Sequence, residues 1–593
     1  MVTPLSFSSS SKSNRRRIIA AGAAAGAAGI GAGWWLAQPP KLQERKVPQL
    51  PAGRQSAKGL NILLVMTDQE RFDLPAALPL PGHDRLRERG STFTQHQVNT
   101  TPCSPSRSNL YFGQHTQHTR MTVNLGVYPE PQIPAAMPSL GHYLRANGYY
   151  TAYKGKWHLS ELRAHYELTY GRYPSAVDAL EPFGFSDFNF DGDPHGSTWT
   201  GFKFDGQIAS EASTWLHTKG KALGANKPWF LAVNFVNPHD VMYYASGQAQ
   251  VKSRVHRDYL SPLAPAPLSK PYDKLWDLPL PANHKADLKS KPWAHANYSD
   301  FCNFAFGKVP ATEEAWKAYQ SYYFNCLRDV DSHLLTLLDA LQASGQADNT
   351  IVIFTADHGE MAGAQGLRQK GPFMYQENVR VPFIVRHPDA RHGHQTAALS
   401  SAVDLVPTIL EMAGVQPKKI QELYPQLAGV SVAAAVAKAD AQTERTARGA
   451  LYNYNTLHYI DSEFVYKVAQ SGINADRFLP LKALASFGQP LSKRSNPAFF
   501  RGIHTGQYKF ARYFQPAQHH TPTDWQTLVK HNQLELYDIS ADPQEANNLA
   551  AKITPPTQAL IMKLNTQLNA LVAKEVGTDL GDEHPGPSFL KRL

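Results

Sequence analysis

LNILLVMTDQ, residues 60–69, is a continuous apolar run that ends abruptly in polar residues. Two further runs have the same character, WFLAVNFV at residues 229–236 and IVIF at residues 351–354. Apolar residues that continue without alternation are typical of strands buried on both faces, as in a parallel sheet with helices on either side. The three runs therefore predict an α/β fold built on a large, mostly parallel sheet sandwiched by helices.

Helical patterns lie between these runs. Residues 319–344 place apolar side chains on one face and stop at Gly345, and residues 139–147 form a shorter helix before a strand at 149–153. This texture continues to about residue 414 and predicts a larger domain over residues 59–414. From residue 415 to 593, short β-like pieces at 451–454 and 507–513 alternate with turns. They predict a smaller C-terminal α+β domain that carries an antiparallel sheet.

An insertion at about residues 245–310 interrupts the larger domain. Its central part, Ser261–Ser299, is rich in proline, lysine and aromatic residues and has little periodicity. Irregular stretches of this length are typical of functional insertions or lids. We expect this one, with Trp276 and Trp293, to line the entrance of a site, the alternative being an ordinary surface loop.

The charge of the chain is concentrated partly at its start. Of the formal net charge of +10 over 593 residues, four charges lie on Lys12 and Arg15–Arg17, within acid-free residues 1–37. An apolar, Gly/Ala-rich stretch follows at 18–37, which is the order of an export signal. Asn14–Ile19 resembles the twin-arginine (Tat) motif, whose pathway exports folded proteins. We therefore expect export to a bacterial periplasm or the medium, with residues 1–37 as a signal or an uncleaved anchor and 38–58 as a linker.

The rest of the composition excludes several classes of protein. The remaining charge of +6 (10 − 4) is scattered, so no nucleic-acid partner is expected. Three cysteines are too few for a disulfide scaffold or a cysteine-rich zinc domain. Cys302 and Cys326 could pair outside the cytoplasm, but nothing in the sequence requires it. The oligomeric state is left open.

Polar residues follow each predicted strand at the point where it ends. Asp68 and Gln69 close the first run, Asp357 and His358 follow the third, and His239 follows the run at 229–236. In parallel α/β sheets, sites form outside the carboxyl ends of the strands. Oxygen ligands suit a hard divalent cation, and an imidazole also admits a first-row transition metal. A single Asp here could simply cap a helix, but the recurrence at three strands favours a metal pocket.

A second cluster reads TPCSPSR over residues 101–107. Pro105 favours a helix start just after Cys103, which places the thiol at a helix N-terminus, where backbone N–H groups favour an anion. Arg107 adds a positive fork suited to a tetrahedral oxyanion.

Basic residues form two further motifs. YKGKWHL at 153–159 brings two lysines, Lys154 and Lys156, and His158, which would suit an anion clamp beside a general base, the alternative being solvated surface lysines. GLRQKG at 366–371 brings Lys370, a weaker signal by itself. The residues alone thus indicate a metal-assisted pocket for a tetrahedral oxyanion ester, with Cys103 as the nucleophile or its precursor.

With these motifs, the sequence resembles the type I sulfatases of the alkaline-phosphatase-like superfamily. Cys103–Arg107 matches the family's C-x-P-x-R signature, whose cysteine is oxidised to formylglycine (3-oxoalanine), and Gly155–Leu159 matches its GKWHL motif. The remaining matches are Asn61–Asp68, Thr355–Glu360, and ELYD at 535–538 continued by Asp542-Pro543 and Asn548-Leu549. Five motifs in the right order, spanning about residues 59–549, make the resemblance specific.

The resemblance implies a role for each matched residue. Asp68, Gln69, Asp357 and His358 would hold one divalent metal together with Cys103, which as hydrated formylglycine would be the nucleophile. Arg107 would stabilise that group, and Lys156 and Lys370 would bind sulfate oxygens. His239 would help to protonate the leaving oxygen, and His158 would act as the base of the second step. A formylglycine-generating enzyme would modify Cys103 before export of the folded chain by the Tat machinery.

The resemblance also contains departures that define alternatives. Many sulfatases have Asp-Asp and Asp-Asn where this chain has Asp68-Gln69 and Asp357-His358, and these variants resemble the choline sulfatase and phosphonate monoester hydrolase branch. Calcium is the usual family ion, and manganese or magnesium stay open. The sequence predicts a sulfatase acting on a small-molecule or saccharide sulfate monoester. The alternatives are a phosphonate monoester or phosphodiester hydrolase with the same site, and an inactive binding protein that keeps its thiol.

Overall fold

A computed structural model describes residues 48–53, 59–125, 132–162, 179–190, 192–224, 226–254, 261–390, 393–456, 496–516, 518, 520–579 and 581. The predicted export signal at residues 1–37 and most of the predicted linker at 38–58 lie outside the described residues.

The larger sheet has seven strands in the order β3-β4-β1-β5-β6-β2-β7. Only β6 runs antiparallel to its neighbours. The strands are β1 Asn61–Asp68, β2 Ser91–Gln97, β3 Tyr150–Gly155, β4 Trp229–Pro238, β5 Thr350–Ala356, β6 Phe383–Arg386 and β7 His394–Ser401. The three apolar runs of the sequence are β4, β1 and β5, which pair side by side. The predicted mostly parallel sheet is confirmed.

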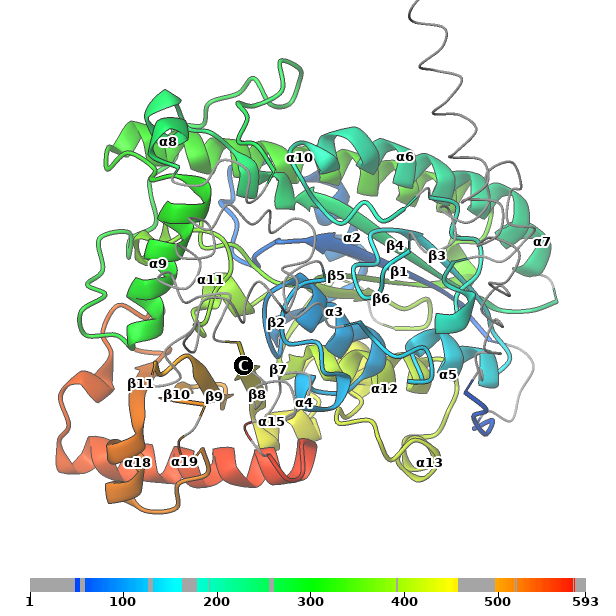
Figure 1. Ribbon diagram of the computed structural model, residues 1–593. Coiled ribbons are helices and arrows are strands. Elements are labelled where there is room, and N and C mark those ends of the chain that lie inside the picture. The colour runs from blue at the N-terminus through cyan, green and yellow to red at the C-terminus, as the bar shows by residue number, and fades with distance from the viewer. Residues whose placement is uncertain are drawn as a thin grey trace, which may run out of the picture. The chain divides into compact units, whose positions relative to one another are not determined.

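Helices cover both faces of this sheet, as Figure 1 shows. Leu63 and Val65 of β1 share a core cluster with residues of α2 (Pro81–Arg89), α6 (Thr200–Trp215) and α10 (Glu313–Ala343). The alternate residues Leu64 and Met66 share another with residues of α3 (Cys103–Phe112), α5 (Leu140–Ala146) and α12 (Leu405–Met412). This two-sided burial explains why the strands are apolar without alternation.

Helix ends follow local capping chemistry. The Ser139 hydroxyl accepts hydrogen bonds from Gly141 N and His142 N, so α5 begins where the sequence predicts. The α10 helix begins at Glu313, six residues before the predicted start at residue 319, because Thr312 caps it and accepts from Ala315 N. Shorter helices are α4 Thr116–Thr119, α7 Lys221–Gly224, α8 Gln248–Ser253, α11 Gln376–Val379, α13 Pro417–Leu423, α14 Ala433–Ala437 and α15 Glu444–Arg448.

A second, antiparallel sheet of four strands lies in the C-terminal part, in the order β11-β10-β9-β8. Its strands are β8 Ala450–Tyr454, β9 Phe499–His504, β10 Tyr508–Phe514 and β11 Asn532–Asp538, with helices α18 Trp525–His531 and α19 Pro555–Glu575. Leu451, Ile503 and Phe510 share a core with Leu564 and Leu568 of α19. The predicted antiparallel sheet is confirmed. Residues 48–593 form one compact unit, and the domain boundary near residue 415 stays a prediction.

The insertion differs from its prediction in two respects. Its irregular stretch ends at helix α9 (Trp293–Phe306), because apolar residues recur at helical spacing only from this point and are buried. Trp276, which we expected at an entrance, is instead buried against α10, where its Nε1 atom donates to Asn325 at 2.9 Å.

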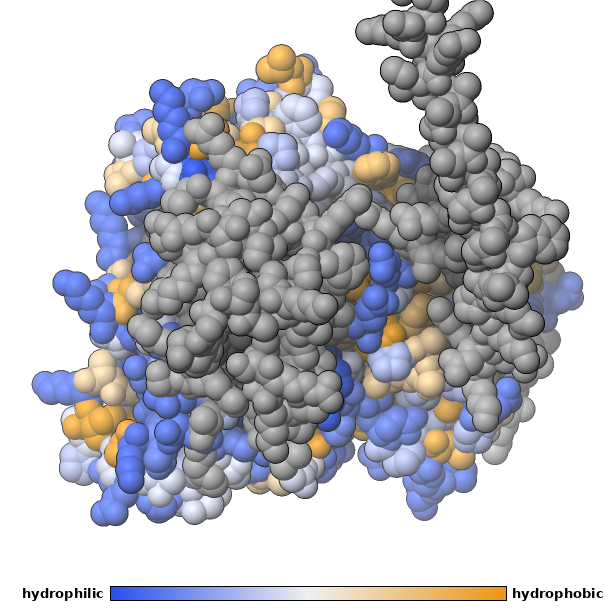
Figure 2. Space-filling model, in the orientation of Figure 1, coloured by the Kyte–Doolittle hydropathy of each residue, from blue (hydrophilic) through white to orange (hydrophobic). Residues whose placement is uncertain are grey.

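The described surface mixes polar and apolar residues. Figure 2 shows hydrophilic and hydrophobic residues interspersed over the coloured part of one face. Within the described residues, no helix is both long and apolar enough to cross a bilayer.

Candidate active site

The site lies where four neighbouring strands end. Asp68 is the last residue of β1, Lys156 follows β3, His239 follows β4 and Asp357 follows β5. Because β3, β4, β1 and β5 are adjacent and parallel, their carboxyl ends meet at one edge of the sheet. The structure therefore brings together the polar strand ends, as the sequence predicts.

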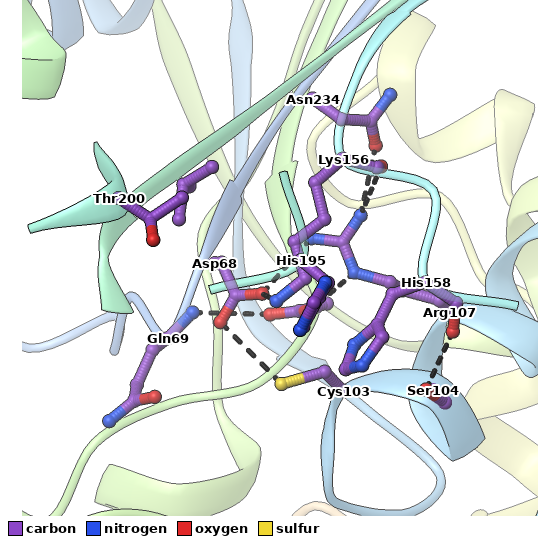
Figure 3. A network of polar contacts seen from close by, with 12 residues as sticks. Asp68, Gln69, Cys103, Ser104, Arg107, Lys156, His158, His195, Thr200 and Asn234 are labelled. Carbon is purple, nitrogen blue, oxygen red and sulfur yellow. Dashed lines mark hydrogen bonds and ion pairs between the residues drawn. The ribbon is translucent and has the colours of Figure 1, made fainter. Parts of the chain in front are cut away.

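Cys103 lies at the centre of this cluster (Figure 3). It is the first residue of α3 and is fully buried. Its Sγ atom is 3.1 Å from Nε2 of His358 and 3.7 Å from Oδ1 of Asp68. Asp68, Cys103, Asp357 and His358 each offer one ligand atom, and these four atoms lie within 4.8 Å of one another. Two carboxylates, an imidazole and the Cys103 position form one compact donor set.

Arg107 neutralises the carboxylates from one side. Its guanidinium donates to Asp357 Oδ2 at 2.8 Å, to Asp68 Oδ2 at 3.2 Å and to the Lys156 carbonyl at 2.9 Å. Its remaining contact is Oδ1 of Asn234, at 3.4 Å. Since Cys103 and Arg107 lie four residues apart on the same face of α3, one helix turn fixes both relative to the strand ends.

The pKa values of the two carboxylates shift in opposite directions. Burial opposes the charge of Asp68, but Lys156, His239, Arg107 and His358 outweigh it and hold the pKa of Asp68 well below its usual range. Burial and the neighbouring Asp68 charge raise the pKa of Asp357. Each of these buried carboxylates therefore opposes the ionisation of the other. A divalent cation bound between them would favour the charged form of both, so the pair is suited to hold a metal ion.

Two buried lysines act on Cys103. The Nζ atom of Lys156 donates to Asp68 Oδ2 at 2.5 Å. The Nζ atom of Lys370 donates to the Gln69 side-chain oxygen and is 3.5 Å from the Met242 sulfur. Burial and Asp68 disfavour a thiolate, but Lys156, Lys370 and His358 outweigh them and lower the pKa of the Cys103 thiol. The pocket is thus built to hold negative charge at Cys103 and beside it.

Gln69 is oriented by two neighbours. Its side-chain nitrogen donates to Oε2 of Glu360 at 2.5 Å and its backbone N–H donates to Oδ1 of Asp357 at 3.1 Å. Figure 3 shows its side chain directed away from Cys103. The amide oxygen faces Lys370, and its role as a metal ligand stays a prediction.

Two histidines complete the cluster. Burial and Lys156 lower the pKa of His158 well below its usual range, and burial and Lys370 do the same for His239. Among the described residues, neither Nδ1 atom has a hydrogen-bond partner. Both rings are therefore neutral at neutral pH and each has a nitrogen available for a ligand or a proton.

Comparison with known proteins decides the family. A model of the family described as Sulfatase matches residues 60–415, more than half of the chain. The chain belongs to the sulfatase family. A second model, described as N-sulphoglucosamine sulphohydrolase, C-terminal, matches residues 363–479. Family membership makes the chain a sulfuric ester hydrolase and confirms the resemblance identified from its motifs.

Individual relatives of this sulfatase are distant. The choline-sulfatase of Rhizobium meliloti is 26% identical over 394 residues, covering 63% of this chain and 70% of the relative. An ulvan-active sulfatase of Formosa agariphila is 26% identical over 543 residues, covering 88% and 82%.

Solved structures share the fold. One was determined in complex with its substrate, D-glucosamine-2-N,6-O-disulfate, and has a TM-score of 0.61 at 19% identity, covering 88% of this chain and all of the other. The phosphonate monoester hydrolase of Agrobacterium radiobacter has a TM-score of 0.59 at 21% identity, covering 87% and 96%.

The structure of this sulfatase also reveals residues that the motifs missed. Asp193 accepts hydrogen bonds from the backbone N–H groups of Trp157 and His158, and the His195 ring stacks on His158. Glu360, quoted only as part of a motif, accepts from Gln69, and its other oxygen accepts from Gln369 N at 2.7 Å. Residues 192–200 have no periodicity and no strand before them, so the only available signal is the turn sequence Asp-Pro-His-Gly at 193–196.

Proposed function

We propose that this sulfatase hydrolyses a sulfate monoester to an alcohol or phenol and inorganic sulfate, using a formylglycine made from Cys103 and one divalent metal. The observation that carries the proposal is the place of Cys103. It is the one cysteine of the described chain in contact with Asp68 and His358, whereas Cys302 and Cys326 are buried elsewhere in the core.

Asp68, Gln69, Asp357 and His358 would hold the metal, with residue 103 beside them. When bound, the ion supplies positive charge that acidifies an adjacent hydroxyl and polarises a sulfate oxygen. Calcium is expected from the family, and His358 also makes manganese a suitable ion, since an imidazole nitrogen is a better ligand for a first-row transition metal. Hydrated formylglycine supplies two hydroxyls, one to attack sulfur and one whose deprotonation expels sulfate.

The lysines hold the anionic group of the substrate. Lys156 contacts Asp68 and Lys370 contacts Gln69, and both side chains are buried, so their charges act on a sulfate with little screening by water. Arg107 is committed to the two carboxylates and keeps the donor set in place. These fixed cations stabilise the negative charge that the sulfuryl oxygens carry in the transition state.

The two histidines move protons at different atoms. His158 is neutral at neutral pH and can therefore take the proton of the second hydroxyl. His239 must carry a proton to give it to the leaving oxygen. The lysines and burial oppose this, and the negative charge of a bound sulfate ester counteracts them and favours the imidazolium.

Mass spectrometry tests the proposed nucleophile. In protein produced with its formylglycine-generating enzyme, the peptide with residue 103 should have the mass of the aldehyde or its hydrate. Cys103→Ala should lose all turnover and keep the thermal unfolding temperature within a few degrees. Cys302→Ala, a matched change at a buried cysteine outside the site, should keep turnover. A retained thiol in an active enzyme, or an active Cys103→Ala variant, would overturn the proposal, and an unmodified, inactive chain would support the binding-protein alternative.

The donor set also favours a second candidate. The pairs Asp68-Gln69 and Asp357-His358 resemble the metal motifs of the phosphonate monoester hydrolase branch. Phosphonate monoesters and phosphodiesters are monoanions like a sulfate monoester, so the same pocket suits them. The ratio of kcat/KM for 4-nitrophenyl sulfate to that for 4-nitrophenyl phenylphosphonate decides between them. A ratio below one overturns the sulfate assignment.

We also propose that the mature enzyme acts outside the cytoplasm, as residues 1–37 indicate, after modification of Cys103 in the cytoplasm and Tat export of the folded chain. Residues 59–414 would form the catalytic domain and 415–593 the smaller domain. Replacing Arg15 and Arg16 by lysine should retain the enzyme in the cytoplasm, which cell fractionation measures. Unchanged export would contradict this assignment.

A further inference from the structure

The proposed mechanism assigns residues to the sulfate group and leaves the organic part of the ester without a partner. The exposed fractions of the site's side chains indicate where the organic part of the ester lies. Cys103, Arg107 and Lys156 are 0% exposed and Lys370 is 1% exposed, whereas His158 and His239 are 4% and 5% exposed. Among these six groups, only the two histidines are more than 1% exposed. We therefore infer that the leaving group extends past them.

A single loop, residues 192–200, contacts both histidines. Asp193 accepts from Trp157 N at 3.0 Å and from His158 N at 2.6 Å. The ring of His195 stacks on that of His158, with centroids 5.4 Å apart and planes at 25°. Figure 3 shows the two rings next to each other, close to Cys103.

Gly196 brings the same loop onto the second histidine. A Cβ atom added at Gly196 would lie 2.5 Å from Cε1 of His239, so the backbone itself forms the contact. Its φ of 117° is also a conformation that side chains disfavour. The loop thus lies against the ring that faces the leaving oxygen in the proposed mechanism.

The insertion at residues 245–310 stabilises this loop through two hydrogen bonds. The Thr198 hydroxyl donates to the Pro262 carbonyl, and the Trp199 Nε1 atom donates to the Pro265 carbonyl at 3.0 Å. Ser197 N also donates to the Thr200 hydroxyl at 2.7 Å. His195 is consequently presented at a fixed position while its own side chain stays exposed to solvent.

The hydrogen bond of His195 defines what its free nitrogen can do. Nδ1 lies 3.0 Å from the carbonyl oxygen of Asp193, which can only accept, so in the neutral ring Nδ1 carries the proton. Nε2 is then an acceptor, and it has no hydrogen-bond partner within the described part of the chain. An acceptor beside His158 pairs with a hydroxyl donor of the organic group, which sugars carry next to the ester carbon and a simple aryl group lacks.

We propose that His195 is a specificity-determining residue that contacts the organic part of the substrate and accepts, through Nε2, a hydrogen bond from a hydroxyl group of a carbohydrate sulfate. This inference rests on the proposed sulfatase activity and deepens it by naming the substrate class.

The experiment compares His195→Ala, His195→Asn and the wild type, all with residue 103 verified as formylglycine by mass spectrometry. The substrates are 4-nitrophenyl sulfate and a panel of monosaccharide monosulfates. His195→Ala should lose kcat/KM on the best sugar sulfate about 10-fold more than on the aryl sulfate, mainly through KM, because one neutral hydrogen bond made in both ground and transition state is lost. His195→Asn keeps a carbonyl acceptor and should recover part of that loss. His217→Ala, at an exposed histidine outside the site, is the matched control.

The outcomes separate the two levels of the proposal. A wild type that cleaves no sulfate ester refutes the proposed function itself. A wild type that cleaves the aryl sulfate but none of the sugar sulfates overturns the substrate class. Equal losses on both substrates in His195→Ala, or no loss on either, overturn the specificity role and leave the sulfatase activity standing.

Discussion

Asp193 provides a way to separate the two chemical steps of the proposed reaction. Its carboxylate oxygens accept hydrogen bonds from Trp157 N at 3.0 Å and from His158 N at 2.6 Å. His158 has a φ of 57°, which is uncommon for a residue other than glycine. The carboxylate therefore stabilises the proposed base of the second step in an uncommon backbone conformation.

The magnitude follows from these contacts. Asp193→Asn keeps one acceptor oxygen and places an NH₂ group against the second N–H, so one charge-assisted hydrogen bond of about 1.5–3 kcal/mol is lost. If that energy is lost from the transition state of the second step, its rate falls about 10- to 150-fold. The first step uses His239, which Asp193 does not contact, and should change much less.

Rapid-quench kinetics with 4-nitrophenyl sulfate measures both steps in the same samples. Asp193→Asn should release phenol in a burst of about one equivalent per active site, followed by a slow phase in which phenol and sulfate appear together. Asp187→Asn is the matched control, because Asp187 accepts from Trp215 Nε1 and the Lys219 ammonium outside the site. A slow phase without a burst, or equal slowing of both steps, would refute the assignment of His158 to the second step.

Two further predictions concern metal binding and acid stability. Saturating Ca²⁺ or Mn²⁺ should raise the thermal unfolding temperature of the chelator-treated wild type, by an amount that corresponds to about 3 kcal/mol at 100 times Kd. Asp357→Asn should abolish this rise, whereas the control Asp187→Asn should show it. An unchanged rise in Asp357→Asn would exclude Asp357 as a ligand. Burial opposes the charge of Glu535, but His295, Tyr537 and Lys291 outweigh it and lower its pKa from 4.5 to about 2. Because the folded-state pKa is the lower one, Glu535 stabilises the fold above about pH 4.5 by about 3 kcal/mol, and this contribution is lost as the pH falls toward 2. Thermal unfolding of Glu535→Gln should therefore show a deficit at pH 7 that shrinks below pH 4.5, and a deficit independent of pH would contradict this reasoning.

The sequence predicts those parts of the fold and site that depend on local pattern. The runs that became β1, β4 and β5 are apolar on both faces, and this property is visible without tertiary information. Asp68 and Asp357 follow such strands directly, so their convergence needs only the rule that parallel strands end together. Cys103 and Arg107 are tied by one helix turn.

Long-range packing determines what the sequence could not predict. Gly196, in a loop, contacts His239, which follows a strand, and no periodic pattern in the sequence indicates this contact. Trp276 is wrongly predicted to line an entrance, because the sequence of its irregular segment does not show that the side chain packs against α10. The orientation of Gln69 likewise depends on Glu360, which lies 291 residues away in the chain.

The charges of the site, rather than the net charge of the chain, explain an anionic substrate. Asp68 and Asp357 carry two negative charges, and Arg107, Lys156 and Lys370 carry three positive ones, all at most 1% exposed. Counting only these five groups, the sum is +1 without a metal and +3 with a divalent ion. A monoanionic ester thus meets an excess of buried positive charge that the solvent screens weakly. Loss of the metal should therefore weaken binding of the ester as well as the chemistry, and the Kd of the ester, measured by calorimetry on the chelator-treated enzyme, should be higher than with the ion bound.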